Sequence, residues 1–182
     1  MSTANRYTTT AITLHWGVAL LILSAFPLGL YMVDLPLSPD KLKLYSYHKW
    51  IGVTVFLLVA ARLAWRLTHA PPPLPDGIAA WQRRASSAVH GALYVLMVAI
   101  PLSGWLMSSA KGFQTVWFGV IPLPDLLARD RELGDLLATV HMALNYTLAA
   151  LVILHVAAAL KHHFIERLPF LQRMGLGRKA RA

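Results

Sequence analysis

Two histidines lie within the last long apolar stretch of the chain, residues 138–163. His141 and His155 are fourteen residues apart, so in an α-helix their side chains project from nearly the same face. They are separated by about 21 Å along the helix axis, and the stretch is long enough to cross a bilayer. Imidazole groups inside a membrane are costly and need partners. We therefore hypothesise that each of these imidazoles binds the iron of a haem.

Four apolar stretches in the chain are long enough to span a membrane as helices. They cover about residues 11–33, 44–67, 86–107 and 138–163. Residues 125–135 mix acidic and basic side chains and are expected to form a short surface helix. The predicted fold is all-α, an integral membrane antiparallel four-helix bundle that forms one domain over residues 1–182.

Two further histidines lie at matching depths in the predicted bundle. His15 is early in the first helix and reaches the depth of His155, whereas His48 is early in the second helix and reaches the depth of His141. Two imidazoles that fill both axial positions of a haem iron leave no free site for dioxygen, so one-electron transfer is the expected chemistry. The pattern predicts two haems in the bundle, one above the other.

Other roles for these histidines are weaker. A histidine inside a membrane also serves as a hydrogen-bonding group between helices, but that role does not explain two depth-matched pairs. A bare transition-metal ion is the main chemical alternative, because imidazole also binds zinc, copper and iron. The pairs have no carboxylates nearby, and two ligands at each level are few for such an ion.

The composition restricts the class of protein. Of the 182 residues, 57% are hydrophobic and only 14% are charged, which indicates a membrane protein. The chain has no cysteine, and this excludes disulfides, thiolate-bound iron–sulfur clusters and covalently attached c-type haem. The net charge of +9 is not accompanied by any nucleic-acid recognition motif, so binding to nucleic acid is not expected.

The distribution of Lys and Arg predicts the orientation of the bundle. If both termini lie in the cytoplasm, eleven of the 17 Lys and Arg residues lie on the cytoplasmic side, together with two of the eight acidic residues. Basic residues are enriched on the cytoplasmic side of membrane proteins. We therefore expect a multi-pass protein of the bacterial inner membrane with both termini inside.

Five blocks of sequence resemble the bacterial cytochrome b561 family of four-helix membrane proteins, and they occur in the family's order over nearly the whole chain. The blocks are Leu14–Trp16 (LHW), Tyr47–Gly52 (YHKWIG), the Pro71–Pro75 linker, His90–Met107 and Val140–Phe164. The resemblance implies two b-type haems, one held by His15 with His155 and the other by His48 with His141. It also implies electron exchange with quinone and, in some members, oxidation of superoxide at the outer face of the inner membrane.

Four more residues are candidates for secondary roles. His162 shares a helix face with His155, and with His163 it is expected to bind a quinone head group or supply its protons, although a cluster anchored in the lipid headgroups is an equal alternative. His90 is expected to contact a haem propionate. Lys49, next to His48, is expected to attract a small anion such as superoxide, or else simply to lie in the membrane interface.

Two functions fit these features. The first is a superoxide:ubiquinone oxidoreductase that takes electrons outside the membrane and delivers them to ubiquinone within the lipid. The second is a haem-bearing membrane anchor and electron-transfer subunit, which passes electrons between a dehydrogenase or hydrogenase partner protein and the quinone pool. Co-purification with a large catalytic partner favours the second function, and direct reaction with superoxide favours the first.

Overall fold

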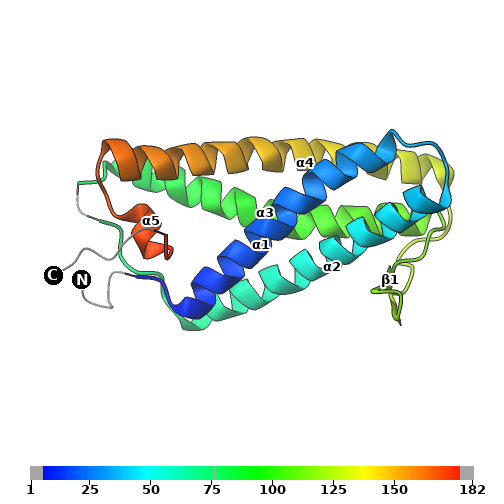
Figure 1. Ribbon diagram of the computed structural model, residues 1–182, viewed down its shortest axis with the longest axis horizontal. Coiled ribbons are helices and arrows are strands. Elements are labelled where there is room, and N and C mark those ends of the chain that lie inside the picture. Colours follow the sequence, from blue (N-terminus) through cyan, green and yellow to red (C-terminus); the bar gives the residue numbers. More distant parts are fainter. Residues whose placement is uncertain (1–5, 76, 177–182) are drawn as a thin grey trace.

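Four long helices dominate the computed structural model, which describes residues 6–75 and 77–176 (Figure 1). They are α1 (Thr9–Val33), α2 (Pro39–Thr68), α3 (Ala80–Ala110) and α4 (Arg131–Leu160). All four are long and apolar enough to cross a bilayer. The expected all-α four-helix membrane bundle is therefore confirmed.

All four helices begin before the stretches expected from hydropathy, and polar side chains cap the first turns of three of them, α1, α2 and α4. The side chain of Ser38 accepts a hydrogen bond from the Lys41 N–H, and Pro39 follows in the first turn of α2. Asp130 accepts in the same way from the Leu133 N–H at the start of α4. The prediction of a separate surface helix at 125–135 is wrong, since the residues after Asp130 form the first turn of α4.

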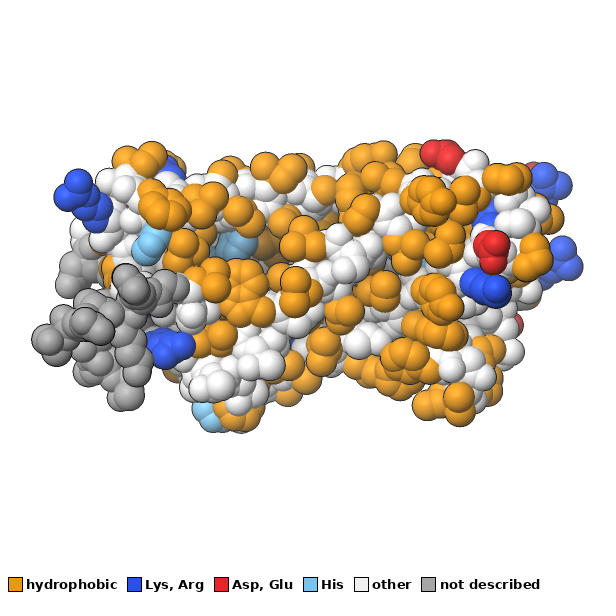
Figure 2. All heavy atoms as spheres, viewed as in Figure 1, with side chains coloured by type: hydrophobic (Ala, Val, Ile, Leu, Met, Phe, Trp, Pro, Cys, Tyr) orange, Lys and Arg blue, Asp and Glu red, His pale blue; other side chains and the backbone are white. Residues whose placement is uncertain are grey.

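Packing between the helices is extensive within two pairs, α1 with α2 and α3 with α4. One core cluster joins Val18 of α1 to Val55 and Val59 of α2. A second cluster joins Leu93, Leu96 and Ile100 of α3 to Leu148 of α4. Few other apolar side chains are buried, and Figure 2 shows hydrophobic side chains along the length of the bundle with charged ones gathered at its two ends. This distribution is that of a surface in contact with lipid.

The two ends of the bundle carry different segments, a β-hairpin at one end (the hairpin end) and the segment after α4 at the other (the terminal end). At the hairpin end, β1 (Val116–Trp117) and β2 (Ile121–Pro122) form an antiparallel hairpin beside α2 (Figure 1). At the terminal end, α4 continues into a π-helical turn η2 (Lys161–Ile165), and the chain then folds back into the short helix α5 (Phe170–Arg173). The hairpin was not expected from the sequence.

Arg173 fixes the folded-back segment at the terminal end. Its side chain is buried and donates hydrogen bonds to the carbonyls of Pro72 (2.9 Å) and Pro73 (2.7 Å) in the α2–α3 connection. Its guanidinium also lies over the rings of Tyr7 and Phe170. One side chain therefore joins the start of the chain, the proline-rich linker and α5.

Candidate functional site

His48 of α2 and His141 of α4 face each other at the hairpin end. Their ring centroids are 6.3 Å apart and their planes are 80° apart. Nδ1 of His141 lies 3.1 Å from the Ile100 carbonyl oxygen and 2.9 Å from Ser103 Oγ. Because a carbonyl oxygen only accepts, this contact favours the proton on Nδ1 and leaves the Nε2 lone pair free for a metal.

Two glycines pack directly against these two rings. A Cβ added to Gly29 of α1 would lie 3.1 Å from Cε1 of His48, and a Cβ added to Gly104 of α3 would lie 3.1 Å from Cε1 of His141. The absence of a side chain therefore lets a neighbouring helix approach the edge of each imidazole. Nδ1 of His48 is buried and has no hydrogen-bond partner among the residues that the structure describes.

His15 of α1 and His155 of α4 form the second pair, at the terminal end. Their ring centroids are 6.2 Å apart and their planes are 62° apart. His90 of α3 is closer to His155, with 5.1 Å between centroids, and its Nδ1 lies 3.3 Å from Ser86 Oγ. Three histidines from three helices therefore meet at this level, and only two can be axial ligands of one iron.

The distances between rings distinguish the possible ligand pairs. Metal–imidazole bonds are about 2.0–2.1 Å long in zinc sites, and the ring centroid lies about 1.1 Å beyond the bonded nitrogen. Two imidazoles on opposite sides of one iron should thus have centroids about 6.3 Å apart. The pairs His15–His155 (6.2 Å) and His48–His141 (6.3 Å) fit this value, whereas His90 and His155 (5.1 Å) are too close.

Three glycines near the histidines face open space. Added Cβ atoms at Gly17, Gly52 and Gly91 would meet no other side chain or neighbouring helix within 4 Å. These glycines lie within about one helical turn of His15, His48 and His90 respectively. The donor set suits a haem, because each pair offers two imidazole groups, the number of protein ligands that fills both free positions of a haem iron.

Arg62 contributes to the terminal-end site, although it was not among the site residues expected from the sequence. Its Nε donates to the Tyr94 hydroxyl (2.9 Å) and its Nη1 to the Ala11 carbonyl (2.7 Å). Tyr94 and Ala11 each lie four residues, about one helical turn, from His90 and His15. Arg62 follows His48 by fourteen residues, the same spacing that separates His141 from His155. This spacing was the signal in the sequence that could have placed Arg62 on the same helix face as His48.

The remaining candidates make contacts of their own. Lys49 Nζ donates to the Phe113 carbonyl (2.9 Å), which ties it to the α3–α4 connection. Nδ1 of His162 lies 2.5 Å from Glu166 Oε2, and its ring stacks on Phe170 with 5.0 Å between centroids. Nδ1 of His163 lies 3.2 Å from the Leu168 carbonyl oxygen. His162 and His163 are thus held by residues 166–170, which follow η2.

Glu166 carries the charge that organises this segment. Hydrogen bonds from Lys161 (2.8 Å) and His162 lower the pKa of the Glu166 carboxyl below its ordinary value. The carboxylate thereby joins η2 to the loop that leads into α5.

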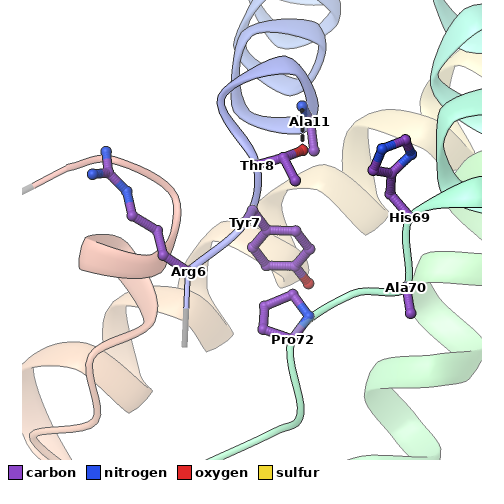
Figure 3. Close-up of a pocket in the computed structure, with 7 residues that line it drawn as sticks. All are labelled: Arg6, Tyr7, Thr8, Ala11, His69, Ala70 and Pro72. Atoms are coloured by element: carbon purple, nitrogen blue, oxygen red, sulfur yellow. Dashed lines mark hydrogen bonds between the residues drawn. The ribbon is translucent and has the colours of Figure 1, made fainter. Parts of the chain in front are cut away.

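A cavity of about 230 Å³ opens at the terminal end, between the start of α1 and the linker after α2 (Figure 3). Its lining residues are Arg6, Tyr7, Thr8, Ala11, His69, Ala70 and Pro72. In Figure 3 the rings of Tyr7 and Pro72 lie close to each other, whereas the guanidinium of Arg6 points away from them. No predicted site residue lines this cavity, so we assign it no role in electron transfer.

Comparison with known proteins identifies the family. The sequence profile described as prokaryotic cytochrome b561 matches residues 6–177. The chain is 35% identical to cytochrome b561 homolog 2 of Escherichia coli (strain K12), over 95% of this chain and 93% of the relative. It is 29% identical to cytochrome b561 homolog 1 of the same organism, over 96% of this chain and 99% of the relative.

A third relative has a name that states an activity. The chain is 25% identical to the probable superoxide oxidase CybB of Yersinia pestis, over 93% of this chain and 95% of the relative. The family match covers all four membrane helices and both histidine pairs. The chain therefore belongs to the prokaryotic cytochrome b561 family, whose members are haem-bearing membrane proteins that transfer electrons.

Proposed function

We propose that this protein carries electrons across the bacterial inner membrane, from superoxide at the outer face to ubiquinone. The observation that carries the proposal is the presence of two histidine pairs, at opposite ends of the bundle, with centroid separations of 6.2 and 6.3 Å. The name of the Yersinia pestis relative supports superoxide as the donor. The excess of Lys and Arg supports a cytoplasmic position for the terminal end.

Each histidine pair would hold one b-type haem. When bound, each haem supplies a centre that takes up and releases a single electron. The Ile100 carbonyl and the Ser103 hydroxyl orient His141 through its Nδ1 atom, so its Nε2 atom points in a fixed direction. Arg62 and His90 would lie beside the haem at the terminal end, where a guanidinium or an imidazole can bind a propionate.

The net reaction needs both electrons and protons. Two superoxide anions each lose one electron and become dioxygen, while one ubiquinone takes up two electrons and two protons to form ubiquinol. At the hairpin end, Lys49 uses one of its three N–H donors on Phe113, and its positive charge would attract superoxide. At the terminal end, His162 with Glu166, and His163, would bind the quinone head group or hold the protons that it takes up.

Pulse experiments on the purified holoprotein in detergent test this proposal. A superoxide pulse is expected to reduce the haem rapidly, and added ubiquinone is expected to reoxidise it. Lys49→Met should slow the first step and weaken its dependence on salt, because steering of an anion is screened by ions. Lys43→Met is a matched control, since its ammonium lies beside Asp40 and is mostly exposed.

Failure of the haem to react with superoxide would contradict the proposed donor. If the protein also co-purified with a large dehydrogenase or hydrogenase, it would instead act as a membrane anchor that passes electrons between that partner and the quinone pool. The haem ligands would be the same in both cases.

A further inference from the structure

The hairpin beside α2 exposes a continuous set of large apolar side chains. The segment from Phe113 to Pro124 contains no charged residue. Within it Phe113 is 62% exposed, Phe118 57%, Val120 77% and Ile121 49%. In Figure 2 hydrophobic side chains cover the lower right corner, where Figure 1 shows the hairpin. An apolar patch of this kind, outside the helices, marks an interaction surface.

Indole groups fix the hairpin to the flank of α2. Trp50 Nε1 donates to the Val116 carbonyl (2.7 Å), and Trp117 Nε1 donates to Thr54 Oγ1 (3.3 Å). Thr54 lies six residues further into the bundle than His48, or about 9 Å along the helix. The indole of Trp117 therefore reaches a depth that lies inside the membrane if His48 does.

The backbone of the hairpin satisfies its own hydrogen bonds, as a segment in contact with lipid must. The N–H groups of Gly119 and Val120 donate to the carbonyls of Val116 and Trp117, and the Leu123 N–H donates to the Thr115 carbonyl. Three residues, 118–120, connect the paired residues Trp117 and Ile121, and the first two of them, Phe118 and Gly119, have positive φ (50° and 71°). The ring of Phe118 lies against the rings of Trp50 (5.5 Å between centroids) and Trp117 (5.0 Å), and the residue stays more than half exposed.

We propose that residues 116–122 insert into the lipid leaflet at the hairpin end and anchor the bundle at that interface. The exposed side chains of the hairpin are apolar, and the nearest charge that the contacts show, Lys49, is bonded to the Phe113 carbonyl outside residues 116–122. Tryptophans with a bonded N–H and an apolar ring are typical of the membrane–water interface. Lipid is therefore the occupant of this surface, in preference to a second copy of the chain or a soluble protein. The proposal does not depend on the electron donor or acceptor.

Single spin labels test the insertion directly, because the chain has no cysteine to remove. The haem-loaded full-length protein is reconstituted in phosphatidylcholine–phosphatidylglycerol vesicles, with the label on Val120→Cys or Ile121→Cys. Ile153→Cys on α4, 70% exposed, is the lipid-facing control. Leu37→Cys in the α1–α2 connection, 84% exposed, is the water-facing control. An unchanged haem absorption spectrum in each variant confirms that the fold is intact.

The collision rates of each spin label with oxygen and with a water-soluble nickel complex show whether the label lies in lipid, in water or under protein. Labels on the hairpin are expected to resemble Ile153→Cys, with frequent oxygen collisions and few nickel collisions. A hairpin label that resembles Leu37→Cys would place the hairpin in water and overturn the proposal. Protection from both reagents would mean that protein covers the surface, and it would overturn the proposal as well.

Discussion

Gly104→Ala should disturb the haem at the hairpin end by displacing His141. The new methyl group would lie 3.1 Å from Cε1 of the imidazole, whereas carbon atoms prefer separations of about 3.5–4.0 Å. The ring has to move by a few tenths of an ångström, and its hydrogen bonds to Ile100 and Ser103, which belong to the same helix as Gly104, resist that movement. Overpacking of this kind costs about 1–3 kcal/mol, equivalent to about a five- to 150-fold loss of haem affinity.

Gly29→Ala provides the matched comparison. Its methyl group would approach Cε1 of His48 to the same 3.1 Å, but Nδ1 of His48 has no hydrogen-bond partner in the described part of the chain. This ring can rotate away at lower cost, so we expect a smaller loss of haem than in Gly104→Ala.

Haem content per polypeptide and a redox-titrated visible spectrum measure both effects. Gly104→Ala should lower the occupancy, or shift the midpoint potential, of one of two spectral components and leave the other unchanged. A larger effect of Gly29→Ala, or an equal effect of Gly104→Ala on both components, would refute the role assigned to the hydrogen bonds of His141.

Three further predictions follow from the same geometry. Gly52→Leu should lower haem content without preventing membrane insertion, because the leucine side chain would fill the open space beside His48. A haem content equal to that of the wild-type protein would contradict the placement of the macrocycle. Arg173→Ala should lower the free energy of unfolding by about 1–3 kcal/mol in thermal melts, since it leaves the carbonyls of Pro72 and Pro73 without their donor. The pKa of Glu166 is lowered, so its carboxylate should stabilise the terminal segment above pH 4.5, and this stabilisation should be lost as the pH falls through the lowered pKa. Limited proteolysis of the segment should show this loss in the wild-type protein. The Glu166→Gln variant should show no such dependence on pH.

The main features of the bundle were accessible from the sequence because they depend on regular helix geometry. The fourteen-residue spacing of His141 and His155 sets their shared face, and helix direction then sets which histidine lies opposite each one. The structure brings the same residues together, with centroids 6.2 and 6.3 Å apart. Their ligation of haem iron remains a prediction until it is measured.

Features that depend on contacts between distant segments were not accessible. In the hairpin Phe118 and Gly119 adopt positive φ, and hydrogen bonds of Trp50 and Trp117 hold the strands against α2. No local sequence pattern predicts those contacts. The role of Gly104 likewise depends on how closely α3 approaches His141. α4 begins earlier than expected because a cap at Asp130 outweighs the charge that follows it.

The most direct test of the account is the redox-titrated visible spectrum, with haem quantification, of five single His→Ala variants. His15→Ala and His155→Ala should impair the same haem, and His48→Ala and His141→Ala should impair the other. His90→Ala should retain both haems, because its ring is too close to His155 for an iron to lie between them. Loss of the same spectral component in His15→Ala and His48→Ala, or a correctly inserted wild-type protein that binds no haem, would contradict the account.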